Sequence, residues 1–154
     1  MGSAAKPGAL TPVIRPASPE DRFGLSELLD ILGYPCPPEE IGGRLLALRQ
    51  DANQTVLIAD VQGAAVGMVA CDLSYYLPLG APTCRITALA VAESAQRVGV
   101  GRLLLREAES LARGAGAVRI ELTSAAHRLE AHAFYRACGY GDGALRFVKH
   151  LGDA

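Results

Sequence analysis

Two segments of the sequence combine residue types and spacing that suit a chemical site. The first, Gln96-Arg-Val-Gly-Val-Gly-Arg102, precedes a helical pattern, and the second is Ala131-His-Ala-Phe-Tyr-Arg-Ala-Cys-Gly-Tyr140. Glycines at the start of a helix let a bulky anion reach backbone N–H groups, and the positive end of the helix dipole favours a pyrophosphate there. The first segment therefore indicates an anion-binding turn formed by Gln96, Arg97, Val98, Gly99, Val100, Gly101 and Arg102.

Two common nucleotide-binding loops do not fit this turn. A P-loop needs a lysine and then a serine or threonine directly after its last glycine, but Arg102 and Leu103 follow Gly101. A dinucleotide-binding fingerprint needs a further glycine at the position that is Leu104 here. By themselves, the two glycines are also compatible with an ordinary helix start. Their meaning therefore depends on the elements around them.

Those elements follow from hydrophobic periodicity and from turn residues. Apolar residues from Val100 to Ala112 recur every three or four positions, which predicts the strongest helix of the chain. The nearly unbroken apolar run from Cys84 to Val91 predicts a central strand that is covered on both faces. Strands are expected at residues 11–15, 55–59, 64–73, 84–91, 118–122 and 145–149, and helices at 19–32, 39–49, 99–114 and 129–138.

This order mixes hairpins with crossover helices, so we expect a single mixed α/β sheet with helices on both faces. The second helix is the least secure element, because Gly42 and Gly43 lie in its interior.

In this element order, the two chemical segments resemble one protein family. Gln96-x-x-Gly99-x-Gly101 at a helix start, followed by Ala131-x-x-Phe134-Tyr135-x-x-x-Gly139-Tyr140, is similar to the GCN5-related N-acetyltransferase (GNAT) superfamily. The resemblance extends over residues 11–149 and implies an α+β GNAT-like fold, with a mostly antiparallel mixed sheet and a splayed central strand pair. It also implies acetyl-CoA as co-substrate. The pyrophosphate would bind the turn at residues 96–102, and the pantetheine arm would follow Leu89, Ala90 and Val91.

The resemblance further implies roles for single residues. Tyr135 matches the tyrosine that protonates the leaving CoA thiolate, and a backbone N–H near Val91 would hold the oxyanion. Arg97 and Arg102 would add charged contacts to the cofactor. Arg128 occupies a position where many relatives carry an asparagine that helps to hold the cofactor. It therefore either contacts a CoA phosphate or faces solvent.

The sequence does not identify a general base. Arg85, Thr87 and Leu89 occupy the positions of the central strand where a glutamate would be a familiar base. Removal of the proton from the amine is then left to water or to one of three carboxylates, Asp72, Glu93 and Glu121. The acceptor is expected between residues 30–49 and 74–83, where several side chains are suited to a cationic amine: Tyr34, Glu39, Glu40, Tyr75 and Tyr76.

Composition limits the remaining possibilities. Residues 1–10 are mostly Gly, Ala, Ser and Pro, which predicts a flexible leader, and the length of 154 residues indicates a single domain over 11–154. The formal net charge of −1 argues against a nucleic-acid partner. No apolar stretch is long enough for a membrane span, and no signal peptide is visible, so we expect a cytoplasmic protein. The four cysteines are far apart and lack zinc-ligand spacing, so we expect no metal. The sequence leaves open whether the protein forms a homodimer.

The leading interpretation is an acetyl-CoA-dependent N-acetyltransferase that acts on a primary amine of a small molecule or peptide. One alternative keeps the same fold and the acyl-CoA site but lacks turnover, and serves as a binding or sensor module. Another is a plain α/β interaction domain whose glycines are structural.

Overall fold

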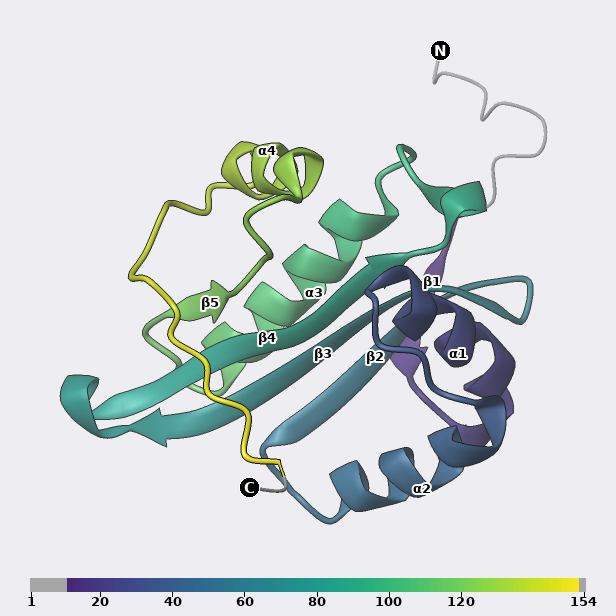
Figure 1. Ribbon diagram of the computed structural model, residues 1–154, viewed down its shortest axis with the longest axis horizontal. Helices are drawn as coiled ribbons and strands as arrows, with labels where there is room; N and C mark the ends of the chain where they lie inside the picture. The colour runs from purple at the N-terminus through teal and green to yellow at the C-terminus, as the bar shows by residue number, and fades with distance from the viewer. Residues whose placement is uncertain (1–10, 153–154) are drawn as a thin grey trace.

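In the computed structural model, which describes residues 11–152, five strands form one sheet in sequence order. They are β1 (Val13–Pro16), β2 (Gln54–Val61), β3 (Ala64–Tyr76), β4 (Ala81–Val91) and β5 (Ile120–Leu122). The first four strands pair antiparallel, and β4 pairs with β5 in parallel (Figure 1). This mixed, mostly antiparallel sheet confirms the predicted fold class. The predicted leader at residues 1–10 lies outside the described residues.

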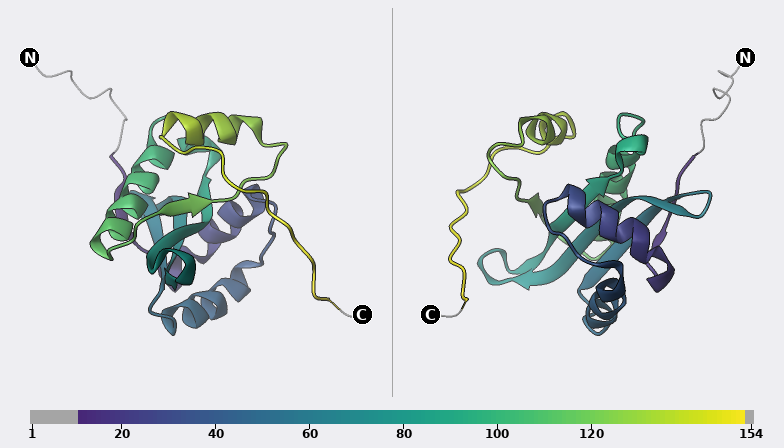
Figure 2. Two further views of the ribbon diagram at one scale, coloured as in Figure 1. Left: turned by 90° about the vertical axis from the view of Figure 1, so that its left-hand side faces the viewer. Right: turned by 45° about the vertical axis from the view of Figure 1, so that its right-hand side comes forward.

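Helices cover both faces of the sheet, as predicted. On one face lie α1 (Arg22–Ile31), which follows the short helix η1 (Pro19–Asp21), and α2 (Pro38–Arg49). On the opposite face lies α3 (Val100–Gly114) (Figure 2, left). The remaining helices are α4 (Leu129–Ala137) and two short ones, η2 (Leu77–Leu79) and η3 (Glu93–Ala95).

Two buried clusters, one on each face, hold these layers together. Toward α3, the sheet contributes Val69, Cys84 and Ile86, which pack with Leu104 and Leu105. Toward α1 and α2, a second cluster contains Leu25, Leu28, Ile41, Leu45, Ile58, Met68, Ala70 and Ala90. Strand β4 thus buries side chains on both faces, which confirms it as the central strand.

Helix α2 forms in spite of Gly42 and Gly43. Its two buried residues, Ile41 and Leu45, are four positions apart and pack in the same cluster as α1. Their burial removes apolar surface from water on one side of the helix, which outweighs the weak helix propensity of the two glycines.

The prediction of a last strand at residues 145–149 is wrong in this structure. Residues 141–152 contain no helix or strand, and Figure 1 shows them as an extended segment that follows α4. Leu145, Phe147 and Leu151 are 83%, 90% and 92% exposed. Alternating apolar residues favour a strand only where a neighbouring strand supplies hydrogen bonds, and the short β5 does not pair with this segment.

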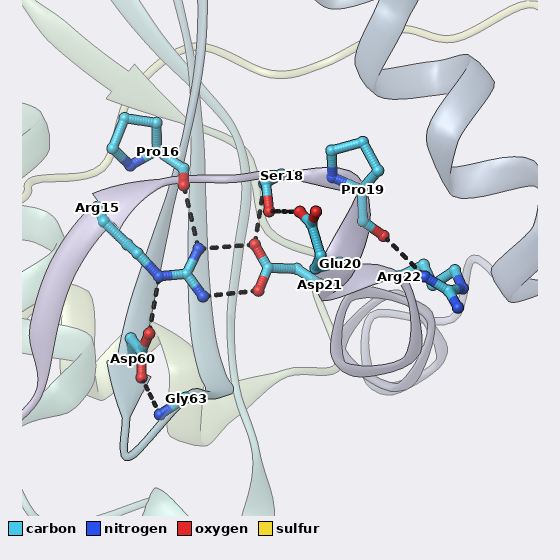
Figure 3. A network of polar contacts seen from close by, with 9 residues as sticks. All are labelled: Arg15, Pro16, Ser18, Pro19, Glu20, Asp21, Arg22, Asp60 and Gly63. Atoms are coloured by element: carbon cyan, nitrogen blue, oxygen red, sulfur yellow. Dashed lines mark hydrogen bonds and ion pairs between the residues drawn. The ribbon is translucent and has the colours of Figure 1, made fainter.

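An ion-pair network joins the first strand to the elements around it (Figure 3). The guanidinium of Arg15 donates to both oxygens of Asp21, at 2.7 and 2.8 Å, and through Nε to Asp60 at 2.7 Å. Asp21 also accepts the N–H of Ser18, and Asp60 accepts the N–H of Gly63. The hydrogen bonds from Arg15 lower the pKa of both carboxyls. The network fixes β1, η1 and the β2–β3 turn relative to one another.

Candidate active site

Strands β4 and β5 diverge after a short stretch of pairing. The parallel pairing joins Cys84 to Ile120 and ends where Ile86 meets Leu122. On the other side of β4, Cys71 of β3 is paired with Ile86 and Ala70 with Ala88, so Thr87 is an extra residue in β4. Such a bulge bends the strand and increases its twist. The result is the splayed strand pair that the family resemblance predicts.

Beyond the bulge, one edge of β4 is left open to a ligand. The N–H of Ala92 donates to the carbonyl of Val66 on the β3 side at 2.8 Å. Because successive residues of a strand point their N–H groups to opposite sides, the N–H groups of Leu89 and Val91 point toward the gap. Consistent with this direction, the carbonyl of Val91 accepts a hydrogen bond from the side chain of Gln96 at 3.0 Å.

The glycine-containing turn ends at the start of α3 with its backbone donors unobstructed. Arg97 and Gly99 both have positive φ, 65° and 90°, and Gly99 is the N-cap residue of α3. No side chain caps the helix, no acidic residue lies in its first turn, and a Cβ at Gly99 would meet nothing within 4 Å. The first N–H groups of α3 are therefore suited to bind an anion. Arg97 and Arg102 are exposed beside them.

Gly101 has a packing role beside the one predicted for it in the anion-binding turn. It lies inside α3, where a Cβ would come within 3.2 Å of Cζ of Phe134. Its missing side chain therefore makes room for α4 to pack on α3. Gly99 opens the turn, whereas Gly101 fixes the helix that carries Tyr135.

Tyr135 lies on α4 and lines a cavity of about 560 Å³ beside the splay. Its ring packs between Phe134 and Tyr140, with centroids 5.5 and 6.3 Å away. Burial raises its pKa, and the nearby charge of Arg128 partly opposes this shift. The phenol is therefore protonated at neutral pH. Among residues 11–152, no group forms a hydrogen bond with its hydroxyl, so its proton is available to a ligand.

The same cavity brings together parts of the chain that are far apart in sequence. Of the predicted site residues, Leu89 of β4, Arg128 and Tyr135 line it. Val91 packs against the α3 side, and Ala90 is buried toward α1 and α2. Ser124 also lines the cavity, and its hydroxyl is the one buried side-chain polar atom in the described part of the chain that lacks a hydrogen-bond partner. A buried polar atom of this kind is suited to bind a ligand or water.

The three candidate bases occupy different environments. Asp72, on β3, lines the cavity. Glu121 is exposed on β5 and forms an ion pair with Arg119 at 3.6 Å, and Glu93 is exposed in η3. The geometry therefore favours Asp72 as the general base.

The predicted acceptor regions are only partly present in the cavity. From residues 30–49, Leu32, Tyr34 and Arg44 line it, whereas residues 74–83 contribute nothing to it. Sequence reasoning missed Arg44, Arg85 and Arg146 as cavity residues. No local motif marks them, because α2, β4 and the terminal segment meet only in the folded chain.

Comparisons with known proteins agree with this arrangement. The family model described as acetyltransferase (GNAT) family matches residues 25–140. An aminoalkylphosphonate N-acetyltransferase of Salmonella typhimurium is 34% identical over 101 residues, which is 66% of this chain and 66% of that protein. The chain thus matches just under two thirds of the length of this curated relative.

Solved structures share the fold over nearly their whole length. A transcriptional regulator from Bacillus halodurans has a TM-score of 0.83 at 25% identity, covering 91% of this chain and 99% of that one. A GNAT family acetyltransferase from Staphylococcus aureus has a TM-score of 0.78 at 21% identity, covering 92% and 100%. The family model matches most of this chain, so the chain belongs to the acetyltransferase (GNAT) family.

Residues 11–152 contain no group of three or more His, Cys, Asp or Glu side chains placed to hold a metal ion. Over the same range, no helix combines the length and apolar character that a membrane crossing requires.

Proposed function

We propose that the protein transfers the acetyl group of acetyl-CoA to a small primary amine. The observation that carries this proposal is the open edge of β4, which runs from the cavity beside Tyr135 to the uncapped start of α3. An extended pantetheine chain can pair with such an edge, and a pyrophosphate can bind the N–H groups at its end. Leu89, Val91 and the turn at residues 96–102 would hold the cofactor, and Arg128 would approach it from α4.

The residues of the chain supply positioning and one proton. Backbone N–H groups of β4 that point into the gap are suited to hold the carbonyl oxygen of the thioester as negative charge develops on it. The neutral amine attacks the carbonyl carbon, and the C–S bond breaks. Tyr135 gives its phenolic proton to the departing thiolate and regains one from solvent. Holding both substrates in one cavity supplies much of the acceleration without a covalent enzyme intermediate.

For the acceptor, we propose a small-molecule amine of the aminoalkylphosphonate type. This class is taken from the name of the Salmonella relative, and the cationic lining of the cavity agrees with a negatively charged substrate. A peptide amine is less well supported, since the acidic residues Glu39 and Glu40 that we expected to attract a cationic amine are exposed on α2 and do not line the cavity.

Two measurements test the proposal. Isothermal titration with acetyl-CoA should show one site per chain, and thiol release should then depend on an added amine. Binding without thiol release for any amine of a broad panel would favour the inactive acyl-CoA-binding module. Absence of binding would favour the third interpretation, a plain α/β interaction domain in which the glycines have only a structural role.

A further inference from the structure

Most of the charged residues that line the cavity are positive. Four arginines line it, and Asp72 is the one carboxylate among its lining residues: Arg44, Arg85, Arg128 and Arg146 come from α2, β4, the N-cap of α4 and the terminal segment. The whole chain, by contrast, has a formal net charge of −1. The excess of positive charge is therefore local to the cavity rather than a property of the surface as a whole.

These arginines form few ion pairs or hydrogen bonds with other residues of the described chain. Arg85 and Arg128 form no ion pair or side-chain hydrogen bond with any residue of 11–152. Arg146 meets only the neutral hydroxyl of Thr123 at 3.4 Å, and Arg44 lies 3.8 Å from Glu40, with both side chains more than half exposed. A guanidinium presents paired donors that match a carboxylate, phosphate or phosphonate. The unused donors are thus available to an anionic ligand.

The lone carboxylate lies directly beside one of these arginines. Asp72 of β3 is the register partner of Arg85 of β4, and such partners have Cα atoms about 5 Å apart. The hydroxyl of Ser74 donates to Asp72 and fixes one of its oxygens. Asp72 forms no ion pair within the described residues, so its second oxygen is free to accept a hydrogen bond from an ammonium group.

We infer that the acceptor subsite is built for a short amine that carries an anionic group. Arg44, Arg85 and Arg146 bind the anion, while Asp72 binds the ammonium and takes its proton before the attack on the thioester. Arg128 is not assigned to the anion, because it lies close enough to Tyr135 for its charge to lower the pKa of the phenol. Since Asp72 and Arg85 are neighbours in the sheet, the two charged ends of the acceptor are separated by only a few bonds. This inference rests on the proposed function.

Matched amines that differ only in their second group test the anion subsite. Aminoethylphosphonate and β-alanine carry an anion, propylamine is neutral, and ethylenediamine carries a second cation. We expect kcat/KM to be at least about tenfold higher for the anionic amines than for propylamine, because charged hydrogen bonds are lost with a neutral group. The two anions separate phosphonate from carboxylate recognition. Equal use of propylamine would overturn the inference and the anionic acceptor class, but would leave intact the proposed transfer of an acetyl group from acetyl-CoA to a small primary amine. No acetylation of any amine would instead overturn the proposed function.

Substitutions of the lining residues test separately the contacts with the anionic group and with the ammonium group of the acceptor. Arg85→Gln and Arg146→Gln should each raise KM for the anionic amines about tenfold and leave KM for propylamine unchanged. Arg119→Gln is the matched control, since Arg119 lies outside the cavity, where it pairs with Glu121 and stacks on Tyr76.

Asp72→Asn should lower kcat/KM for all four amines about tenfold or more, because the ammonium loses its charged acceptor, while acetyl-CoA affinity stays the same. If Asp72→Asn retains the parent kcat/KM for the amines, or if both arginine variants retain the parent KM for the anionic amines, the assigned roles are wrong. Melting temperatures establish that each variant is folded.

Discussion

The Arg15 network and the cavity beside Tyr135 use arginine in opposite ways. Arg15 donates to two carboxylates at 2.7–2.8 Å, and Asp21 has a side chain only 4% exposed. In the cavity, Arg85 and Arg128 have no such partner among residues 11–152. Desolvating a charge is costly unless it is paired, so the first arrangement serves the fold. The second leaves charge available for a ligand. Whether a charged group is already paired thus distinguishes a structural cluster from a binding site.

The two tyrosines of α4 and the following turn allow the sharpest test of this comparison. Tyr135→Phe removes a hydroxyl that has no partner in the described chain, and we expect kcat to fall about 10²–10⁴-fold with acetyl-CoA affinity unchanged. Tyr140→Phe is the matched control. Its hydroxyl is bonded to Glu109 at 2.9 Å, so its loss should lower the free energy of unfolding by about 1 kcal/mol and leave the chemical step intact.

Single-turnover kinetics should be used, so that product release does not mask the chemical step. Because burial raises the pKa of Tyr135, the phenol keeps its proton through mildly alkaline pH. Loss of this proton should therefore reduce the rate only at a higher pH than it would with a tyrosine of ordinary pKa. An unchanged chemical step in Tyr135→Phe would point to water or to Ser124 as the proton source.

The paired side of the comparison is tested by Asp21→Ala. This change leaves Arg15 with one carboxylate and removes the acceptor for the N–H of Ser18, so we expect a loss of about 3 kcal/mol in the free energy of unfolding. Asp142→Ala breaks an ion pair with Arg136 whose side chains are 59% and 81% exposed, and should cost less than about 1 kcal/mol. Denaturant titration measures both, and equal losses would contradict the distinction.

The same carboxyl predicts a pH dependence of stability. The pKa of Asp21 is lower in the folded protein than in the unfolded chain, chiefly because of the hydrogen bonds from Arg15. Its contribution is therefore complete above the unfolded value of about 3.9 and is lost as the pH falls through the folded value. We expect Asp21→Ala to have a flatter stability curve below about pH 4 than the parent. Parallel curves for the two proteins would exclude this role.

The smallest expected effect concerns the cofactor turn. Gly99→Asp places a negative charge among the N–H groups at the start of α3, and should weaken acetyl-CoA binding about tenfold or more. Gly116→Asp is a matched control, because Gly116 also has positive φ and open space around it but follows the other end of α3. Both variants carry similar backbone strain. If they bind acetyl-CoA equally well when folded, the cofactor site is assigned wrongly.

Several features of the molecule were predictable from local sequence. The spacing of apolar residues in α3 and the hairpin of β2 and β3 follow from side-chain periodicity and turn residues, which act over a few positions. The family motifs indicated the turn at residues 96–102 and Tyr135. In contrast, residues 145–149 have a strand pattern but no partner strand, because pairing depends on an edge that local sequence does not supply.

The sequence by itself determined the order of elements as far as α4, the family, and the residues proposed to bind the cofactor, because these depend on contiguous patterns along the chain. Only the tertiary structure decided the acceptor side. Asp72 and Arg85 become neighbours through the register of β3 and β4, and Arg44 and Arg146 join them from opposite ends of the sequence. Likewise, Gly101 makes space for Phe134 only because α4 packs on α3. Contacts between distant segments depend on how layers pack, so no local spacing reveals them.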